Sequence, residues 1–196
     1  MPRIAVLNAD EIVATAMRHF WQHGYHATSM DALVESIGAS RHAIYTGIGS
    51  KSELYRRGFA AYQSAIVSPA FSVVEKAGAG LAEVAQYFET QIAFAESAGL
   101  PGPGCLIANA MIETAPHDAD IAAEVTKHNA RLHSGFANAL SNENGELDSD
   151  EVSALADFLV VTAQGLWSMS RMVTSAAPLR AHVATTLSLL RKRSDP

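Results

Sequence analysis

Apolar residues recur at the spacing of an α-helix along the whole chain. The positions i, i+3, i+4 and i+7 lie on one helix face, and this pattern occupies 13–20 and again 30–37. No segment alternates apolar and polar residues as a half-buried strand does, and the sequence contains no internal repeat. The pattern therefore predicts an all-α fold.

The first two predicted helices have recognisable ends. Asn8, followed three residues later by Glu11, is typical of a helix start, and Gly24 is typical of a helix end. Thr28 is the expected N-cap of the second helix, which Gly38 closes. We therefore expect one helix between Asn8 and Gly24 and another between Thr28 and Gly38.

A third helix follows the tight link 38–40, with Ser40 as its N-cap. Gly47 and Gly49 limit this helix to about two turns, which is too short to be stable alone, so the first two helices must hold it. The segment 50–53 reads Ser-Lys-Ser-Glu, matches a capping box and opens a fourth helix.

Three short helices with a tight link between the second and third are typical of a helix-turn-helix. In the third helix, Ile44 is expected to point inward. Arg41 and Tyr45, like His42 and Thr46, are four residues apart, so these side chains share the outward face. Arginine can pair with guanine and hydroxyl groups can donate to phosphate, so this face suits DNA. An ordinary small helical bundle with a polar outer face is the alternative.

The charge distribution separates the N-terminal helices from the rest. Residues 1–58 hold six Lys and Arg against five Asp and Glu, whereas 59–196 hold eight against fifteen, and the whole chain has a net charge of −6. Thr28 and Lys51 lie beside the starts of the second and fourth helices, where backbone amides and the helix dipole attract phosphate. A less acidic N-terminal unit on an acidic body indicates a division of labour.

The remaining chain is expected to form a helical body. Helices are predicted over 86–94, 105–113, 121–140, 152–173 and 179–190, with loops over 97–104 and 141–150. The segment 155–172 is nearly all apolar or small, so a helix there must be buried on more than one side. The expected cover is a helix of a second subunit, and a central core helix of a monomer is the alternative.

The sequence predicts a cytoplasmic protein with no membrane partner. Cys105 is the single cysteine and cannot form an internal disulfide. Asp10 follows the N-terminus too soon for the apolar stretch of a signal peptide, and no apolar run approaches the ~20 residues that span a bilayer.

The segment 20–55, FWQHGYHATSMDALVESIGASRHAIYTGIGSKSELY, resembles the N-terminal domain of the TetR family of bacterial transcriptional regulators. The residues that match the family pattern are Phe20, Gly24, Tyr25, Thr28, Gly38, Ser40, Tyr45, Ile48, Ser50 and Lys51. Gly47 stands where the family usually has His or Tyr, Ile48 where it usually has Phe, and His42 where it often has Gly. We expect a looser end of the third helix, a weaker phosphate contact there, and either a DNA contact or a solvated side chain at His42.

The resemblance implies two domains and a mechanism. The DNA-binding domain covers 1–50, with the helix-turn-helix at about 28–48, and a regulatory, ligand-binding and dimerisation domain covers 51–196. A regulator of this kind, expected to be a repressor rather than an activator, binds a palindromic double-stranded DNA operator. It does so as a homodimer joined through its last two long helices, and a small hydrophobic or aromatic effector releases it. No cofactor and no metal are implied.

The resemblance also implies an effector pocket within the body. Large apolar side chains that suit its wall are Tyr87, Phe88, Phe94, Met111, Phe136, Trp167, Met169 and Met172. Polar side chains that suit orientation of a ligand are Asn109, His128, His133 and Gln164. Any one of them can equally be a plain core residue.

Cys105 has two interpretations. It follows a Gly/Pro-rich loop at a predicted helix start, where the helix dipole lowers a thiol pKa and favours a reactive thiolate. Gly-Cys-Leu at 104–106 also resembles a subset of these regulators, some of which sense electrophiles or oxidants. The alternative is a small buried residue that packs the helix start.

Two further classes of protein compete with this interpretation. A helical-bundle enzyme or metal-binding protein is one, and a helical interaction protein without a DNA partner is the other. Glu124 and His128 share a helix face, but the two Glu-x-x-His pairs of a di-iron bundle are absent from the sequence. The sequence also lacks a phosphate-binding loop and a nucleophile elbow, so it predicts neither catalysis nor a metal site.

Overall fold

The computed structural model describes residues 8–143 and 147–192, and these residues form helices and connecting loops without a strand. The N-terminal elements are α1 (Ala9–His23), α2 (Met30–Ile37), α3 (Arg41–Gly47), α4 (Lys51–Tyr62), the π-helix η1 (Gln63–Val67) and α5 (Ser68–Phe71). The C-terminal elements are α6 (Leu81–Ala98), α7 (Leu106–Glu113), α8 (Ala119–Glu143), α9 (Ser149–Met169) and α10 (Ala177–Lys192). The predicted all-α fold is confirmed.

Local capping fixes most of the N-terminal helix ends as predicted. The side chain of Asn8 accepts from the Glu11 amide, and the Glu11 carboxylate accepts from the Asn8 amide, both at 2.9 Å. Ser40 accepts from the amide of Ala43 at 3.1 Å and starts α3. Gly38 ends α2 in the left-handed conformation, with φ of 72°.

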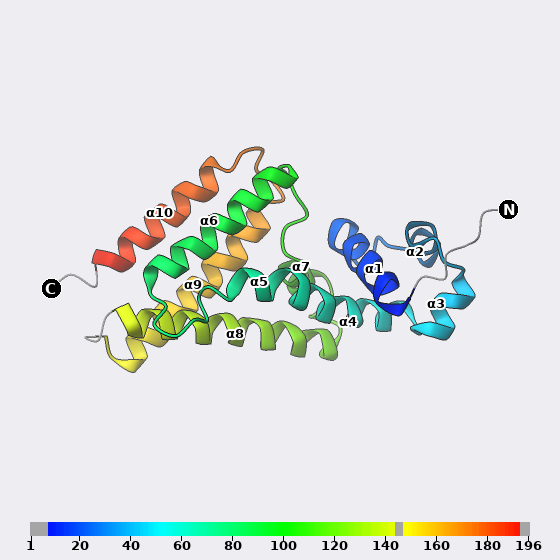
Figure 1. Ribbon diagram of the computed structural model, residues 1–196, viewed down its shortest axis with the longest axis horizontal. Coiled ribbons are helices and arrows are strands. Elements are labelled where there is room, and N and C mark those ends of the chain that lie inside the picture. The colour runs from blue at the N-terminus through cyan, green and yellow to red at the C-terminus, as the bar shows by residue number, and fades with distance from the viewer. Residues whose placement is uncertain (1–7, 144–146, 193–196) are drawn as a thin grey trace.

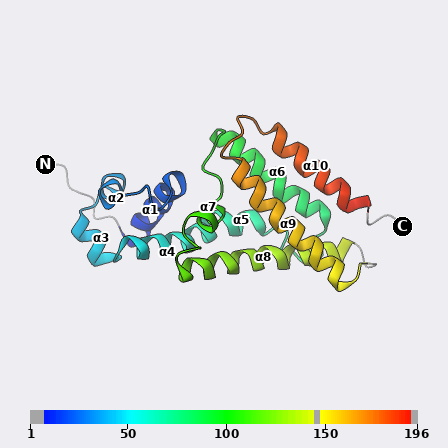
Figure 2. The ribbon, with the colours of Figure 1, turned by 180° about the vertical axis from the view of Figure 1, so that it is seen from behind.

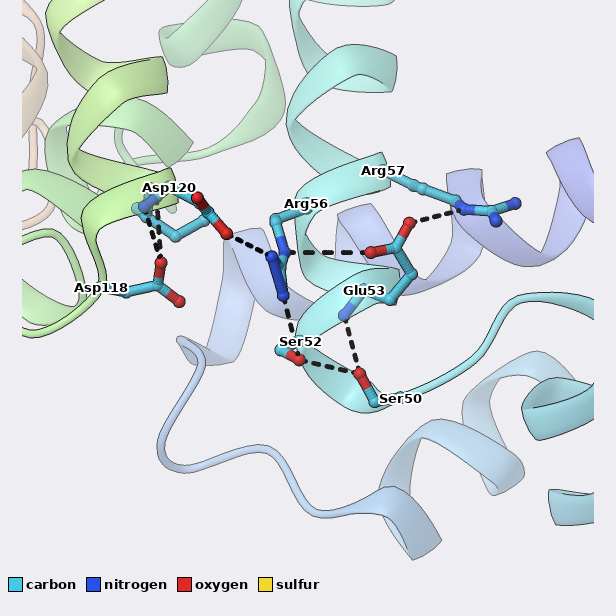
Figure 3. A network of polar contacts seen from close by, with 8 residues as sticks. Ser50, Ser52, Glu53, Arg56, Arg57, Asp118 and Asp120 are labelled. Atoms are coloured by element: carbon cyan, nitrogen blue, oxygen red, sulfur yellow. Dashed lines mark hydrogen bonds and ion pairs between the residues drawn. The ribbon is translucent and has the colours of Figure 1, made fainter.

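Two capping predictions were wrong. The N-cap of α2 is Ser29, whose Oγ accepts from the amide of Ala32 at 3.0 Å. Thr28 is instead buried, and its hydroxyl donates to the carbonyl of Gly24 at 2.6 Å. Ser50 does cap α4, but the Glu53 carboxylate turns toward the arginines of α4 instead of completing a capping box (Figure 3).

The five helices predicted in the body are confirmed as α6 to α10, with their ends shifted by at most five residues. Only α9 ends before its predicted limit.

The segment after α4 was not assigned from the sequence, yet it continues as η1 and α5. Pro69 usually ends a helix, but here it stands in the first turn of α5, where its missing amide hydrogen is not needed. Of the predicted loop 141–150, the first three residues belong to α8, and 144–146 lie outside the described residues. Residues 1–7 and 193–196 of the two predicted domains also lie outside them.

The molecule is elongated, with the two groups of helices at opposite ends (Figure 1). Helices α1 to α3 gather at one end, and α6, α8, α9 and α10 form the other, as the view from behind also shows (Figure 2). Helix α4 leads from α3 into the body, and α7 lies where the two groups meet. One hydrophobic core is continuous through both groups, from Phe20 and Ile44 through Phe59 to Phe88.

Helix α4 belongs physically to both groups. Its N-terminal half packs on α1, where the rings of Phe20 and Tyr55 meet edge to face at 5.0 Å. Its C-terminal residue Tyr62 is buried at the start of the body. A helix that starts beside α3 and ends in the body is a mechanical connection between them.

Among the described residues, one helix, α9, is long and apolar enough to cross a membrane by length and composition alone. Part of this apolar surface packs on α8 and in the core, as at Ala156 and Leu159. Another part is exposed, as at Phe158 and Val161. The composition of α9 therefore reflects two apolar faces, of which only one is covered within this chain.

Candidate nucleic-acid interface and internal cavity

The outward face of α3 carries the polar residues that the sequence placed there. Ile44 is fully buried, whereas Arg41, His42, Tyr45 and Thr46 are exposed. Tyr45 is 47% exposed, so its ring and hydroxyl are open to a partner. The α3 face, defined as these four exposed residues, lies at the end of the molecule away from the body (Figure 1).

Two members of the α3 face have polar partners. Arg41 forms an ion pair with Asp31 of α2 at 2.6 Å, and both side chains are exposed. An exposed pair of this kind is worth little in water, so Arg41 can exchange its partner at small cost. The hydroxyl of Thr46 donates to the carbonyl of His42 at 2.8 Å, which leaves its oxygen free to accept.

Lys51 is held at the start of α4 by an aromatic ring. Its Nζ lies 4.2 Å from the centre of the Tyr25 ring, in a cation–π contact. Partial burial lowers the pKa of Lys51, and the nearby Glu113 carboxylate opposes that shift. Lys51 is the first residue of α4, and the start of this helix is the place predicted for a phosphate. Thr28 does not share this surface, because it is buried.

Glu113 joins the body to the DNA-binding helices, and sequence reasoning did not identify it. Its carboxylate accepts from the backbone amides of Tyr25 and His26, at 3.0 and 2.7 Å. Gly24 lies beside it with φ of 83°, and a Cβ there would meet the Glu113 carboxylate at 3.0 Å. Eighty-seven residues separate Glu113 from His26, so no local pattern relates them.

A second connection joins α4 to α8. The guanidinium of Arg56 donates to the carboxylate of Asp120 at 2.5 Å, and Asp118 accepts from the backbone amide of Asp120 (Figure 3). The same guanidinium approaches Glu53 at 3.9 Å. This network places α4 on the start of α8.

A cavity of about 250 Å³ lies between the DNA-binding helices and the body. Its wall comes from α1, the end of α4, η1, α5, α6, the loop before α7, α8 and the end of α9. Of the residues predicted for an effector pocket, those that line this cavity are Tyr87, Phe94, His128 and Trp167. Cys105 also lines it.

Two of the aromatic residues predicted for the pocket are core residues instead. Phe88 and Phe136 are fully buried, and their rings stack on each other with centres 6.1 Å apart. Phe88 follows Tyr87 directly, and a step of one residue turns a side chain by about 100° around the helix. Phe88 is therefore turned away from the wall that Tyr87 lines, and it packs in the core.

The other predicted residues outside the cavity wall are polar or exposed. The amide of Asn109 donates to the carbonyl of Pro103, and that of Gln164 donates to Asn129. His133 approaches Ser153 through Nε2 at 3.3 Å. The exposed methionines are Met111, Met169 and Met172.

Helix α1 supplies part of the cavity wall, which the sequence did not predict. Arg18, Trp21 and Gln22 line the cavity, and their spacing of three and four residues places them on one face of α1. The indole N–H of Trp21 donates to the carbonyl of Gly104 at 2.9 Å. Gly104 has φ of 74°, and a Cβ there would meet the carbonyl oxygen of Trp167 at 2.9 Å. The first helix of the DNA-binding unit is thus fastened to the loop that lines the cavity.

The titratable groups in the cavity wall are neutral at pH 7, apart from Arg18. Burial, assisted by Arg131, lowers the pKa of His128 to about 4, and its Nδ1 lies 3.0 Å from the side-chain nitrogen of Gln63. Burial raises the pKa of the Tyr62 and Tyr87 phenols above their ordinary value. The interior is therefore aromatic and uncharged.

Of the two interpretations of Cys105, the structure favours the small buried residue that packs the helix start. The thiol is buried, and burial raises its pKa against opposing contributions from the α7 backbone amides and Tyr62. Loss of hydration raises the pKa of the thiol more than the helix start lowers it, because the charged thiolate is the form that hydration stabilises most. Of the described residues, no three His, Cys, Asp or Glu side chains are grouped as metal ligands.

Comparison with known proteins agrees with this geometry. The family model of bacterial regulatory proteins, tetR family, matches residues 12–57, from α1 into α4. The HTH-type transcriptional repressor ComR of Escherichia coli K12 is 30% identical over 197 aligned positions, covering 95% of this chain and 90% of that protein. The uncharacterized HTH-type transcriptional regulator YezE of Bacillus subtilis 168 is 25% identical over 187 residues, covering 91% and 94%.

Solved structures show the same fold over the whole length. A cysteine mutant of the TetR-family regulator CifR, complexed with 26-bp operator DNA, has a TM-score of 0.78 at 22% identity and covers 96% of this chain and 98% of its own. A TetR regulator of Chloroflexus aurantiacus J-10-FL has a TM-score of 0.79 at 20% identity, covering 93% of each chain. With the 30% identical relative and the helix-turn-helix, these matches show that the chain belongs to the TetR family of bacterial transcription regulators.

Proposed function

We propose that this regulator is a cytoplasmic repressor that binds a palindromic operator as a homodimer and leaves it when a small, mostly apolar molecule binds. The α3 face is the observation that carries the proposal. Four exposed polar side chains stand over a fully buried Ile44, at one end of an elongated molecule. A short helix held in this way fits the major groove of DNA.

Each DNA contact is assigned from the position of its side chain. Arg41 exchanges Asp31 for a base edge or a phosphate when DNA arrives, because its present partner is weak. Tyr45 and Lys51 lie at the edge of the α3 face and at the start of α4, and they contact phosphates. Arg41 is therefore the residue that reads sequence, and the other two position the protein.

Dimerisation is supported by the uncovered face of α9. Phe158, Val161, Gly165 and Met169 are exposed and follow one another at intervals of three or four residues. These residues form one apolar stripe along α9. Leu189, on α10, the next helix of the chain, is also exposed. A second copy of the chain is the cover that the proposal assigns to this stripe, and a two-fold dimer requires a palindromic operator.

The cavity supports release by a ligand, because its wall includes residues of α1 and α4, the helices that the proposal expects to move. Tyr62, at the end of α4, lines it, and so do Arg18 and Trp21 of α1. Helix α7 starts at Cys105 in the wall and ends at Glu113, which holds the α1–α2 turn. A ligand that fits only one arrangement of these helices changes the separation of the two reading heads, and operator affinity falls.

A mobility shift on the DNA upstream of the protein's own gene tests the proposed function. Regulators of this kind commonly lie beside the genes that they control, so the neighbouring genes also indicate the pathway. We expect a salt-sensitive complex on this DNA, with unrelated DNA bound more weakly. Equal affinity for unrelated DNA at physiological salt would contradict sequence-specific repression.

Modification of Cys105 is the rival route to release. The thiol lines the cavity, so an electrophile that enters the cavity can reach it. Burial and the raised pKa of the thiol argue against fast reaction. Cys105→Ser distinguishes the routes, and we expect the same compounds to release operator DNA from the wild type and from this variant. Release that is lost in Cys105→Ser would establish the thiol route instead.

A further inference from the structure

The cavity differs in charge from the protein around it. The chain has a net charge of −6, yet none of the described residues that line the cavity carries a carboxylate. Arg18 and His128 are the titratable bases in that wall, and His128 is neutral at pH 7 because burial lowers its pKa to about 4. One permanent positive charge therefore faces an otherwise uncharged cavity.

Arg18 has no acidic partner in the part of the chain that the structure describes. Its guanidinium donates to the hydroxyl of Thr15, one turn earlier on α1, at 3.1 Å. Arg56, Arg131 and Arg180, by contrast, each form an ion pair with a carboxylate. Because Arg18 is exposed while it lines the cavity, its charged end lies at the solvent-facing edge.

Five of the residues that line the cavity carry large aromatic rings. Trp21 and Tyr62 meet edge to face with centres 5.2 Å apart, and Tyr87 and Trp167 meet at 6.4 Å. Phe94 adds a fifth aromatic side chain to the wall. The volume of about 250 Å³ lies near the lower end of the range for ligand sites, roughly 300–1,000 Å³, so it suits a compact ring system.

We propose that the effector is a small aromatic monocarboxylate, with its ring among Trp21, Tyr87 and Trp167 and its carboxylate paired with Arg18. This inference rests on the proposed function and names the class of molecule that releases the DNA. A guanidinium fork binds a carboxylate through two parallel hydrogen bonds, which gives both strength and orientation. An aromatic cation should bind poorly, because Arg18 would repel it and the cavity wall has no carboxylate among the described residues to offset that repulsion.

The position of Arg18 gives the carboxylate a second role. Arg18 belongs to α1, the first helix of the DNA-binding unit, whereas Tyr87 and Trp167 belong to the body. A ligand held at both ends therefore bridges the two groups of helices. The negative charge of the ligand attracts Arg18 and therefore favours one position of α1. The charge of the ligand thus affects operator affinity as well as ligand affinity.

Three compounds with one ring system test this proposal: cinnamate, its neutral amide cinnamamide, and cationic cinnamylamine. Binding is followed in the full-length protein by the fluorescence of Trp21 and Trp167, which are the two tryptophans of the chain and both line the cavity. The variant is Arg18→Gln, and the matched control is Arg57→Gln, because Arg57 is an exposed arginine on α4 that does not line the cavity.

We expect the acid to bind up to about fivefold more tightly than the amide, because water weakens an ion pair at the solvent-facing edge, and the amine to bind most weakly. Arg18→Gln should reduce the affinity for the acid to that for the amide and leave amide binding unchanged. Arg57→Gln should bind all three compounds as the wild type does. Cinnamate should also release operator DNA from the wild type and fail to do so from Arg18→Gln at the same concentration.

Several results would overturn the assignment of the ligand class. These are equal affinities for acid and amide, tighter binding of the amine, unchanged acid binding in Arg18→Gln, and no binding of any of the three compounds. Operator binding without ligand is measured in parallel. If the protein binds the operator without ligand, any of these results leaves the proposed repressor function intact. If it does not bind the operator, the proposed repressor function is contradicted directly.

Discussion

At the residue scale, Arg41 and Lys51 are held in different ways on the surface assigned to DNA. Arg41 is tied to Asp31 by an exposed ion pair that water weakens. Lys51 rests on the Tyr25 ring, which leaves the ammonium hydrogens free to donate. Arg41 can therefore leave Asp31 for a DNA base edge. Lys51 is held at the start of α4, where the proposal places a DNA phosphate.

Substitutions on this surface should separate reading from positioning. Tyr45→Ala and Lys51→Ala should weaken binding about equally on operator and non-operator DNA, because both residues are assigned to phosphates. Arg41→Ala should cost roughly 1–3 kcal/mol on the operator and less elsewhere if it pairs with a guanine. Fluorescence anisotropy on both DNAs measures this, with Lys127→Ala of α8 as the control. Unchanged operator affinity in all three variants would remove the helix-turn-helix assignment.

His128 should make the protein less stable in acid. Its pKa is about 4 when folded and about 6.5 when unfolded, so between these values the unfolded chain binds the extra proton. The free energy of unfolding therefore falls as the pH drops from 6.5 to 4, by up to roughly 3 kcal/mol from this residue alone. Urea unfolding of the wild type and His128→Gln at several pH values measures the effect. The variant should be less sensitive over this window, and parallel pH profiles would show that His128 is not the cause.

Local chemistry predicted some residue positions and not others. Asn8, Ser40 and Ser50 were correct as N-caps, because a cap depends on atoms only three residues away. Thr28 was wrong because its neighbour Ser29 caps equally well, and the turn that closes on Gly24 decides between them. At Cys105 the helix start alone favours a low thiol pKa, but burial by distant residues outweighs it.

At the element scale, α7 is the short rod that joins the cavity to the DNA-binding helices. It begins beside the cavity at Cys105 and ends at Glu113, two turns later. The Glu113 carboxylate there receives two backbone hydrogen bonds from the α1–α2 turn. Helix α7 and α4 therefore act in parallel, the first on the turn before α2 and the second on the helix after α3.

Removing the charge of Glu113 should loosen this connection. In Glu113→Gln, one amide oxygen replaces two carboxylate oxygens, so one backbone amide loses its partner and the other loses a charge-assisted bond. We expect faster hydrogen exchange at the amides of Tyr25 and His26, and a smaller drop in operator affinity when ligand binds. Glu124→Gln, on α8, is the matched control. Unchanged exchange at both amides would show that the contact does not hold the turn.

The apolar pattern was sufficient to predict the helices but not the contacts between them. It indicated α1 to α4 and α6 to α10, because each has a repeating apolar face. η1 and α5 were not predicted, although their apolar residues keep helical spacing, because Pro69 usually ends a helix. The pattern also confined the predicted pocket to the body, although Arg18 and Trp21 on α1 complete its wall. Such contacts join residues far apart in the sequence, so a single-sequence pattern carries no record of them.

At the scale of the whole molecule, one apolar surface is left without a cover. The stripe of Phe158, Val161, Gly165 and Met169 runs along α9 on the side away from its buried residues. Val161 is 69% exposed, and Ile112 on α7 is 70% exposed, but Ile112 has no such stripe around it. An isolated exposed apolar residue is common in monomers, whereas a continuous stripe is typical of an interface.

The uncovered stripe on α9 predicts how the protein assembles on DNA. The wild type should sediment as a dimer at micromolar concentration and bind a palindrome whose half-sites lie about one helical turn apart or slightly more, ~34–36 Å being usual. Val161→Arg should fold normally, because the side chain is exposed, and should sediment as a monomer, because a charge cannot be buried in the interface without a partner. Its affinity for the palindrome should fall to that for a single half-site. Ile112→Arg adds the same charge at an equally exposed position outside the stripe, and it should remain a dimer with normal operator affinity. A monomeric wild type would contradict the proposed assembly, and a dimeric Val161→Arg would place the interface elsewhere.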